Sequence, residues 1–176
     1  MKVFVDLDST LNRLQDKWLP AIYHHLGEMI TIDQVTTWDR LKAASYHTLL
    51  QEPGFFRDLG IESGAQQALQ MAIADGYQVF ILSATEKWDY ADKRDWVEEL
   101  FPFIPRRNFI GAACKGELAG PTRLLIDDGP HNLEAWERAG GIAVAYSQPW
   151  NQSWKGLRMN SWFELAHILG RQANAS

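Results

Sequence analysis

The chain has little of three things: cysteine, long apolar runs and basic charge. Its one cysteine, Cys114, excludes a disulfide within the chain and fits a reducing compartment. No apolar stretch approaches the roughly 20 residues that a membrane span requires, and the N-terminus lacks the basic and apolar regions of a secretory signal. We therefore expect a cytoplasmic protein with no membrane partner.

The charge balance narrows the expected partners further. Lys and Arg number 17 against 22 Asp and Glu, which gives a net charge of −5, and no basic cluster is long enough to follow a nucleic-acid backbone. A polymer of DNA or RNA is therefore not an expected partner. The apolar fraction of 46% is enough for a full core, and the length of 176 residues suits one domain with an insertion.

The chain does have acidic pairs at the ends of two apolar segments. The first segment ends on Asp6 and Asp8, and a later one ends on Asp127 and Asp128 before a Gly-Pro chain breaker. One such pair alone would most often be a solvated turn. In an open parallel sheet, however, ligands bind beyond the carboxyl ends of the strands, so two such pairs predict a shared site.

A third apolar segment ends on small residues, Ser83 and Ala84, and Lys115 lies between this segment and the last acids. Carboxylates are suited to Mg²⁺, while a hydroxyl, the backbone N–H groups after it and an ammonium group can bind phosphate oxygens. An aspartate beside a phosphate can attack it, and a second acid two residues on can act as acid and base. These roles fall to Asp6 and Asp8 respectively.

Strand and helix patterns alternate along the chain, which favours an α/β fold: a Rossmann-like parallel sheet with helices on both faces. After the first strand, a helix that ends at Gly27 and a further helical stretch that ends near Pro53 predict a small inserted helical cap. We expect the cap to comprise residues 12–61, and the core domain to comprise residues 1–11 and 62–176.

Together these motifs resemble the four motifs of the haloacid dehalogenase superfamily of phosphotransferases. Within that superfamily the chain is most similar to the 5′(3′)-deoxyribonucleotidases, a likeness that rests on residues 53–59 (PGFFRDL), 93–98 (KRDWVE) and 124–128 (LLIDD) and on the short cap. The resemblance spans nearly the whole chain. It implies a phosphoric monoester hydrolase with Mg²⁺ as its cofactor.

The resemblance also assigns the catalytic and metal-binding roles. It makes Asp6 the nucleophile and Asp8 the acid and base. It implies that Mg²⁺ is held by Asp6, by the main-chain carbonyl of Asp8 and by Asp128, while Asp127 lies next to these ligands without binding the ion itself.

The phosphate ligands implied by the resemblance are Ser83, Ala84 and Lys115. Lys93 is the competing candidate for the motif lysine. It falls on a predicted helix, where a solvated surface position is the expected one. The predicted loop position of Lys115 favours Lys115, although the choice between the two lysines stays open.

Substrate choice would lie with the cap. Phe55 matches an aromatic residue that stacks on the base in the family, and Trp38 falls near another, but ordinary packing inside the cap is an equal alternative for both. For His131, close to the second acidic pair, a structural role is favoured. We expect the segment from Trp150 to Trp154 to be a surface loop without chemistry.

The predicted function is Mg²⁺-dependent hydrolysis of (deoxy)ribonucleoside 5′- or 3′-monophosphates through an aspartyl-phosphate. The alternatives are a phosphatase of the same superfamily for a sugar phosphate or another small metabolite and, against the order of the motifs, a phospho-accepting receiver domain. The expected partner is thus a nucleoside monophosphate or another small phosphomonoester, and a homodimer is left open.

Overall fold

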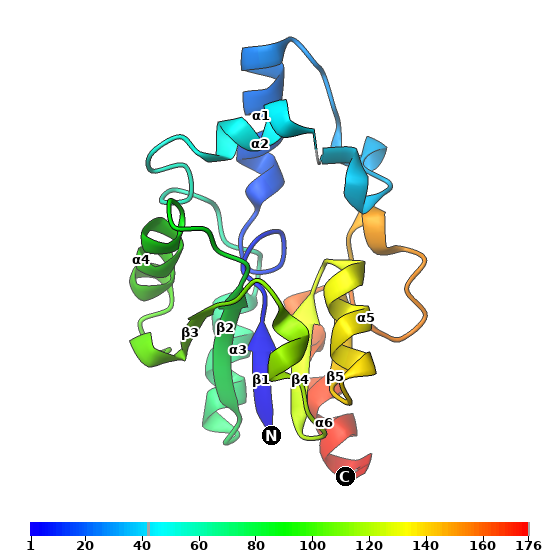
Figure 1. Cartoon of the computed structure of the whole chain (residues 1–176). Coiled ribbons are helices and arrows are strands. Elements are labelled where there is room, and N and C mark those ends of the chain that lie inside the picture. Colours follow the sequence, from blue (N-terminus) through cyan, green and yellow to red (C-terminus); the bar gives the residue numbers. More distant parts are fainter. Residues whose placement is uncertain (42, 176) are drawn as a thin grey trace.

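The computed structural model describes residues 1–41 and 43–175, and a six-stranded sheet forms the centre of the molecule (Figure 1). All neighbouring strands are parallel, in the order β3-β2-β1-β4-β5-β6. The strands are β1 (Lys2–Val5), β2 (Gln78–Ser83), β3 (Phe109–Gly111), β4 (Arg123–Asp127), β5 (Ile142–Tyr146) and β6 (Leu157–Met159). The predicted parallel α/β architecture is therefore confirmed.

In the described residues, six α-helices and six short 3₁₀ helices accompany the strands, and the last of each kind follows β6. The α-helices are α1 (Leu14–Leu26), α2 (Ala44–Leu50), α3 (Ala65–Ala74), α4 (Tyr90–Leu100), α5 (Pro130–Arg138) and α6 (Leu165–Ala175). The 3₁₀ helices are η1 (Ile32–Gln34), η2 (Trp38–Leu41), η3 (Arg106–Asn108), η4 (Lys115–Leu118), η5 (Pro149–Asn151) and η6 (Trp162–Glu164). Within the described ranges, none of these helices has the length and apolar content to cross a membrane.

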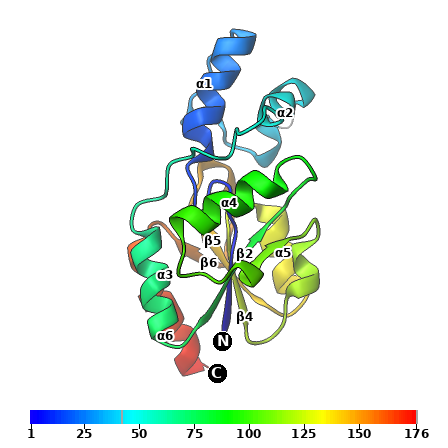
Figure 2. The same cartoon turned by 90° about the vertical axis from the view of Figure 1, so that its left-hand side faces the viewer.

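Helices cover both faces of the sheet, with α3 and α6 on one side and α5 on the other (Figure 2). Because side chains alternate along a strand, Val3 and Val5 of β1 pack with the first layer and Phe4 packs with the second. Phe4 meets Leu133 and Trp136 of α5 there, and all of these side chains are buried. Every strand that ends at the site is therefore anchored between two apolar layers.

Residues 12–61 leave the sheet at its carboxyl end and lie above it, with α1 and α2 as their main helices (Figure 1). The two ends of this segment are joined where they meet the sheet domain. Asn12 and Ile61 form an antiparallel bridge, and the Arg13 N–H donates to the Gly60 carbonyl over 2.9 Å. The two ends of the segment are therefore paired where it joins the sheet domain, and the rest of the segment lies over the strand ends.

Two local expectations fail for physical reasons. The helical stretch predicted between Gly27 and Pro53 is wrong as a continuous element, because the chain there forms the separate helices η1, η2 and α2. The β-branched run from Val35 to Thr37 lowers helix propensity, and Val35 leaves helical geometry with φ −87° and ψ 66°. The sequence analysis also missed β6, because a three-residue edge strand carries too few residues to show an alternating pattern.

The end of α1 provides a test of local stability. Gly27 ends the helix as predicted and has φ 70°, a left-handed conformation that costs a side chain strain. We expect Gly27→Ala to lower the free energy of unfolding by about 1 kcal/mol. Gly170 is the matched control, because it lies inside α6 with open space around it. Gly170→Ala should raise that free energy by about 0.5–1 kcal/mol in the same urea titration, and equal effects of the two variants would contradict the cap geometry.

Candidate active site

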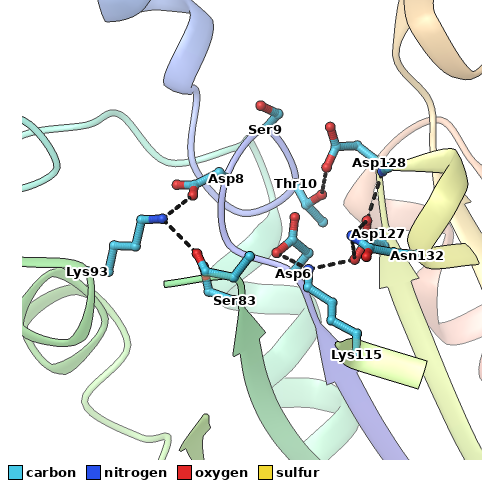
Figure 3. Close-up of polar contacts among 12 residues, drawn as sticks. Asp6, Asp8, Ser9, Thr10, Ser83, Lys93, Lys115, Asp127, Asp128 and Asn132 are labelled. Atoms are coloured by element: carbon cyan, nitrogen blue, oxygen red, sulfur yellow. Dashed lines mark hydrogen bonds and ion pairs between the residues drawn. The ribbon is translucent and has the colours of Figure 1, made fainter. Parts of the chain in front are cut away.

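Three neighbouring strands end at the site, and each contributes a different group (Figure 3). Asp6 directly follows the central strand β1, Asp127 is the last residue of β4, and Ser83 is the last residue of β2. The parallel register pairs Val5 with Ile126, so the first acid after β1 lies beside the end of β4. The predicted meeting of the two acidic pairs at one edge of the sheet is what the structure contains.

Carboxylates gather on the β4 side of Asp6. Oxygens of Asp6, Asp127 and Asp128 lie within 4.8 Å of one another, and all three side chains are buried. Lys115, at the start of η4, donates to Asp6 and, over 2.7 Å, to Asp127 Oδ2. With all three carboxylates ionised, the cluster and the Lys115 ammonium would carry a formal charge of −2 (−3 and +1), and all four side chains are buried.

Burial governs the ionisation of this cluster. It raises the pKa of Asp6 from 3.8 to about 7, opposed by the charge of Lys115 and assisted by those of Asp127 and Asp8. Burial also raises the pKa of Asp128 well above its ordinary value, with the charges of Asp6 and Asp127 adding to the effect. The pKa of Lys115 lies above its ordinary value, because the charges of Asp127 and Asp6 outweigh the opposing effect of its own burial. The donor set therefore fits a hard divalent cation, which would balance the excess negative charge.

The two adjacent acids of β4 are held by different partners. Asp127 accepts hydrogen bonds from the backbone N–H of Gly129 (2.8 Å) and from the side-chain amide of Asn132 (3.1 Å), besides the one from Lys115. Both carboxylate oxygens of Asp127 are thus hydrogen-bonded to neighbouring groups of the protein. Asp128 accepts hydrogen bonds from Thr10 Oγ1 (3.2 Å) and from the indole N–H of Trp150 (3.1 Å).

The turn after β1 orients Asp8. Ser9 has a left-handed backbone with φ 61°, which is uncommon for a residue other than glycine. The Ser9 N–H donates to Asn12 Oδ1 (3.1 Å), and Asn12 in turn donates to Asp8 Oδ1 (2.9 Å). Asp8 is therefore fixed by its own loop, and its side chain stays about one-fifth exposed, at 22%, towards the cavity.

The surface position expected for Lys93 is wrong. Lys93 is on the predicted helix, but it lies in the first turn of α4, which begins beside the site, and its side chain is only 4% exposed. Its Nζ contacts Asp8 Oδ2 (2.7 Å) and Asp89 Oδ2 (2.9 Å) and donates to the Ala84 carbonyl (3.0 Å). Although burial lowers the pKa of Lys93, the charges of Asp8 and Asp89 raise it above the ordinary value.

The hydroxyl predicted to bind phosphate is at the end of β2 but faces inward in this structure. Ser83 is buried and donates to the Ala84 carbonyl over 3.3 Å. Ala84, rather than Ser83, lines the cavity beside Asp6. A rotation of the Ser83 side chain would be needed before its hydroxyl could meet a ligand there.

A cavity of about 350 Å³ lies over the acids, between the strand ends and residues 12–61. Asp6, Asp8 and both lysines line its floor. Its aromatic lining comprises Trp18, Trp38, Phe56, Trp88 and Trp150. A larger hollow of about 430 Å³ between α3 and α6 contains none of these acids or lysines, so the smaller one is the candidate active site.

Of the two aromatic residues predicted to meet the substrate, one lines this cavity. Trp38 does so, and its ring packs 4.9 Å from that of His131, which also lines it. Phe55 is buried and is not among the lining residues; the ammonium group of Lys17 lies 4.7 Å from its ring centroid. The neighbouring Phe56 occupies the lining position and lies under Lys93.

The segment after β5 contacts the acidic cluster, which the sequence analysis did not predict. We expected Trp150 to lie in a surface loop without chemistry, but it is buried and its indole N–H donates to Asp128 Oδ2 over 3.1 Å. Asn151 donates to the Asp128 carbonyl over 3.0 Å. A loop sequence rich in polar and aromatic residues gave no periodic signal for this contact.

Comparison with known proteins places this site in a family. The profile of the family described as 5′ nucleotidase, deoxy (pyrimidine), cytosolic type C protein matches residues 1–174. A 5′(3′)-deoxyribonucleotidase from Clostridium acetobutylicum is 30% identical over 167 residues, 91% of this chain and 89% of the relative. Another from Bacillus subtilis is 26% identical over 173 residues, covering 95% and 97% of the two chains.

Solved structures show the same fold at low sequence identity. A haloacid dehalogenase family hydrolase from Deinococcus radiodurans, solved with phosphate and sodium, superposes with a TM-score of 0.68 at 14% identity, over 98% of this chain and 96% of the other. CbbY from Rhodobacter sphaeroides, solved with phosphate, gives a TM-score of 0.61 at 15% identity, over 93% and 95%. The chain therefore belongs to the 5′ nucleotidase, deoxy (pyrimidine), cytosolic type C family, and its enzyme class is phosphoric monoester hydrolase.

Proposed function

We propose that the chain hydrolyses (deoxy)ribonucleoside 5′- or 3′-monophosphates to nucleoside and phosphate, with Asp6 as the nucleophile. The observation that carries this proposal is the cavity itself: Asp6 and Asp8 lie on its floor beside two buried lysines, under an aromatic wall. The two lysines can bind the phosphate group of a nucleotide, and the aromatic side chains can stack on its base. The names of the relatives, 5′(3′)-deoxyribonucleotidases, agree with this substrate class.

In the proposed reaction, Asp6 attacks phosphorus, so that a carboxylate oxygen forms a P–O bond while the bond to the nucleoside oxygen breaks. Asp8 gives its proton to that leaving oxygen and then takes a proton from the water that attacks the phosphorylated Asp6. This water releases inorganic phosphate and restores both carboxyl groups. The contacts that Asp8 makes with Asn12 and Lys93 support its role, since they hold one carboxyl group close to Asp6 in a fixed orientation.

A divalent cation, Mg²⁺ by its hardness, is part of the proposal. Asp6, Asp128 and the main-chain carbonyl of Asp8 would hold it, and Asp127 would support them through Lys115. The bound cation would neutralise the charge of the phosphate and of the carboxylates around it. With its three carboxylates ionised the cluster has a formal charge of −2, which a divalent rather than a monovalent ion would balance.

Lys115 is the proposed phosphate ligand, with Ser83 and the Ala84 backbone. Within the described residues, Lys93 contacts three oxygen atoms with its three N–H bonds, whereas Lys115 contacts two, both on carboxylates of the cluster. In this assignment Lys93 orients Asp8, and Lys115 turns one N–H bond towards the phosphate.

Residues 12–61 are proposed to form a cap that contacts the nucleoside and selects it. All acidic and lysine side chains lining the cavity come from outside this segment. Within the described part of the chain, the segment contributes apolar and aromatic groups, with Gln15 and His47 as its polar ones. Trp38 is the proposed stacking residue, and Phe56 supports that role better than Phe55, because Phe55 lies behind the lining.

A phosphate-release assay tests the substrate and the nucleophile together. With Mg²⁺, we expect turnover of nucleoside monophosphates above that of sugar phosphates, and no measurable turnover by Asp6→Asn, because an amide oxygen cannot form the acyl phosphate. The isosteric change should leave the circular dichroism spectrum unaltered. Turnover of sugar phosphates alone would reject the nucleotide assignment, and near-normal turnover by Asp6→Asn would reject the nucleophile.

Product inhibition distinguishes the two lysines. Lys115→Met should weaken inhibition by inorganic phosphate and lower kcat by about 10²–10³-fold, as expected for the loss of one charged donor to the reacting group. Lys93→Met should lower kcat while leaving the inhibition constant of phosphate near that of the wild type, because its contacts are with Asp8 and Asp89. The reverse pattern would transfer the phosphate role to Lys93.

The raised pKa values predict how pH affects the metal-free protein. Between the unfolded pKa of Asp6, 3.8, and its folded pKa of about 7, the folded state binds more protons than the unfolded state. The free energy of unfolding in EDTA should therefore fall as the pH rises through this window. Asp128→Asn should flatten this dependence, because the pKa of Asp128 is raised too.

Addition of Mg²⁺ should reverse that loss. At pH 7.5 and fixed ionic strength, Mg²⁺ at a hundred times its dissociation constant is expected to add about 2.7 kcal/mol to the free energy of unfolding. An equivalent ionic strength of NaCl is the control. A melting temperature that neither falls with pH in EDTA nor responds to Mg²⁺ would contradict the assignment of the acidic cluster as a cation site.

A further inference from the structure

We infer that Trp150 is a positioning residue for the divalent-cation site and that it couples this site to the cap. The inference rests on the proposed function, in which Asp128 is a metal ligand and residues 12–61 are the cap. Trp150 lies in η5, is 5% exposed, and its indole N–H donates to Asp128 Oδ2 over 3.1 Å.

Both oxygens of the Asp128 side chain have a neutral donor. Thr10 Oγ1 donates to Oδ1 over 3.2 Å, and Trp150 Nε1 donates to Oδ2. Two donors on opposite oxygens fix the plane of the carboxylate, but they leave its full negative charge for a cation. Such outer partners of a metal ligand set its orientation, and their loss weakens metal binding.

The turn that contains Trp150 is itself tied to both acidic loops. Asn151 donates to the carbonyls of Asp128 (3.0 Å) and Tyr146 (2.7 Å), and Gln148 donates to the Ser9 carbonyl (2.7 Å). Therefore η5 spans the turn after β1 and the turn after β4. A shift of this one element would move the main chain of both loops that carry the acids.

The cap rests on the same turn. Trp38 of η2 meets Trp150 edge-on, with ring centroids 6.2 Å apart and planes inclined by 61°. The neighbouring η1 contacts η5 as well. In Figure 1, the part of segment 12–61 that contains η1 and η2 lies beside the segment that follows β5. The N–H of Trp150 donates to Asp128 in the acid cluster. One buried indole ring thus contacts both the cap and the proposed metal ligand.

Coupling through this ring must act in both directions. If the position of the cap alters the orientation of Asp128, the cap position changes cation affinity, and cation binding changes the stability of the cap position by the same free energy. The cation is then expected to order η1 and η2, although neither element supplies it with a ligand in the proposed site.

The test uses the full chain without metal and the variant Trp150→Phe, which removes the N–H donor and keeps an aromatic ring against Trp38. Calorimetric titration with MgCl₂ should give a dissociation constant about 10–100-fold above that of the wild type. Trp136→Phe is the matched control: it removes an equally buried indole N–H bond, to the Arg123 carbonyl, on the far layer of the sheet. Its dissociation constant should stay within about twofold of the wild-type value.

Amide hydrogen exchange tests the coupling independently of activity. Saturating Mg²⁺ should slow exchange across residues 32–41 in the wild type and in Trp136→Phe, and the slowing should be smaller in Trp150→Phe even when its site is saturated. Equal slowing in all three proteins would overturn the link to the cap, and an unchanged dissociation constant in Trp150→Phe would overturn the positioning role.

The same experiments separate this inference from the proposed function. A protein that hydrolyses no nucleotide, but whose Mg²⁺ affinity falls in Trp150→Phe and not in Trp136→Phe, would refute the substrate and support the positioning role. A wild-type chain that binds no divalent cation would overturn both.

Discussion

The burial of three carboxylates around one lysine is the constraint on which the site depends. Parallel pairing of β1 with β4 brings Asp6 beside Asp127, and the Asp6 N–H donates to the Ile126 carbonyl over 2.9 Å, so the like charges are fixed by the sheet itself. Their mutual repulsion and desolvation cannot be relieved by moving apart. Lys115 and the hydrogen-bond donors offset part of this cost, yet with all three carboxylates ionised the cluster keeps a net charge of −2. A divalent cation is the simplest species that completes it.

The order of the strands divides the chemistry into two sides around Asp6 (Figure 3). On the β4 side, Asp127 and Asp128 form the negative cluster. On the β2 side, β2 ends without an acid, and Lys93 reaches in from α4 to pair with Asp8. The Asp8 side chain therefore pairs with Lys93 on one side of Asp6, while the carboxylates of Asp127 and Asp128 lie on the other.

The parts of this site that follow from local sequence were predictable, and the parts that depend on where an element points were not. Acids at strand ends are visible in the sequence, and the parallel-sheet rule places them together. The helical position of Lys93 was also visible, but periodicity does not say that the first turn of α4 begins beside the β1 loop. Trp150 lies in a turn whose role comes from contacts across 22 positions of sequence, a separation that no local pattern encodes. Phe55 and Phe56 differ by one position, and only the fold selects the one that lines the cavity.

The distribution of groups between cap and core separates recognition from chemistry. The segment 12–61 lines the cavity with apolar and aromatic surface, and all acidic and lysine lining groups come from the strand ends and the elements that follow them. Substitutions in this segment can therefore alter the shape of the cavity without changing the charge balance around Asp6. The contact between Trp38 and Trp150 is where this separation ends, because Trp150 also donates to Asp128. An aromatic residue with an N–H group is well suited to this junction, because its ring packs with Trp38 while its donor contacts the acid.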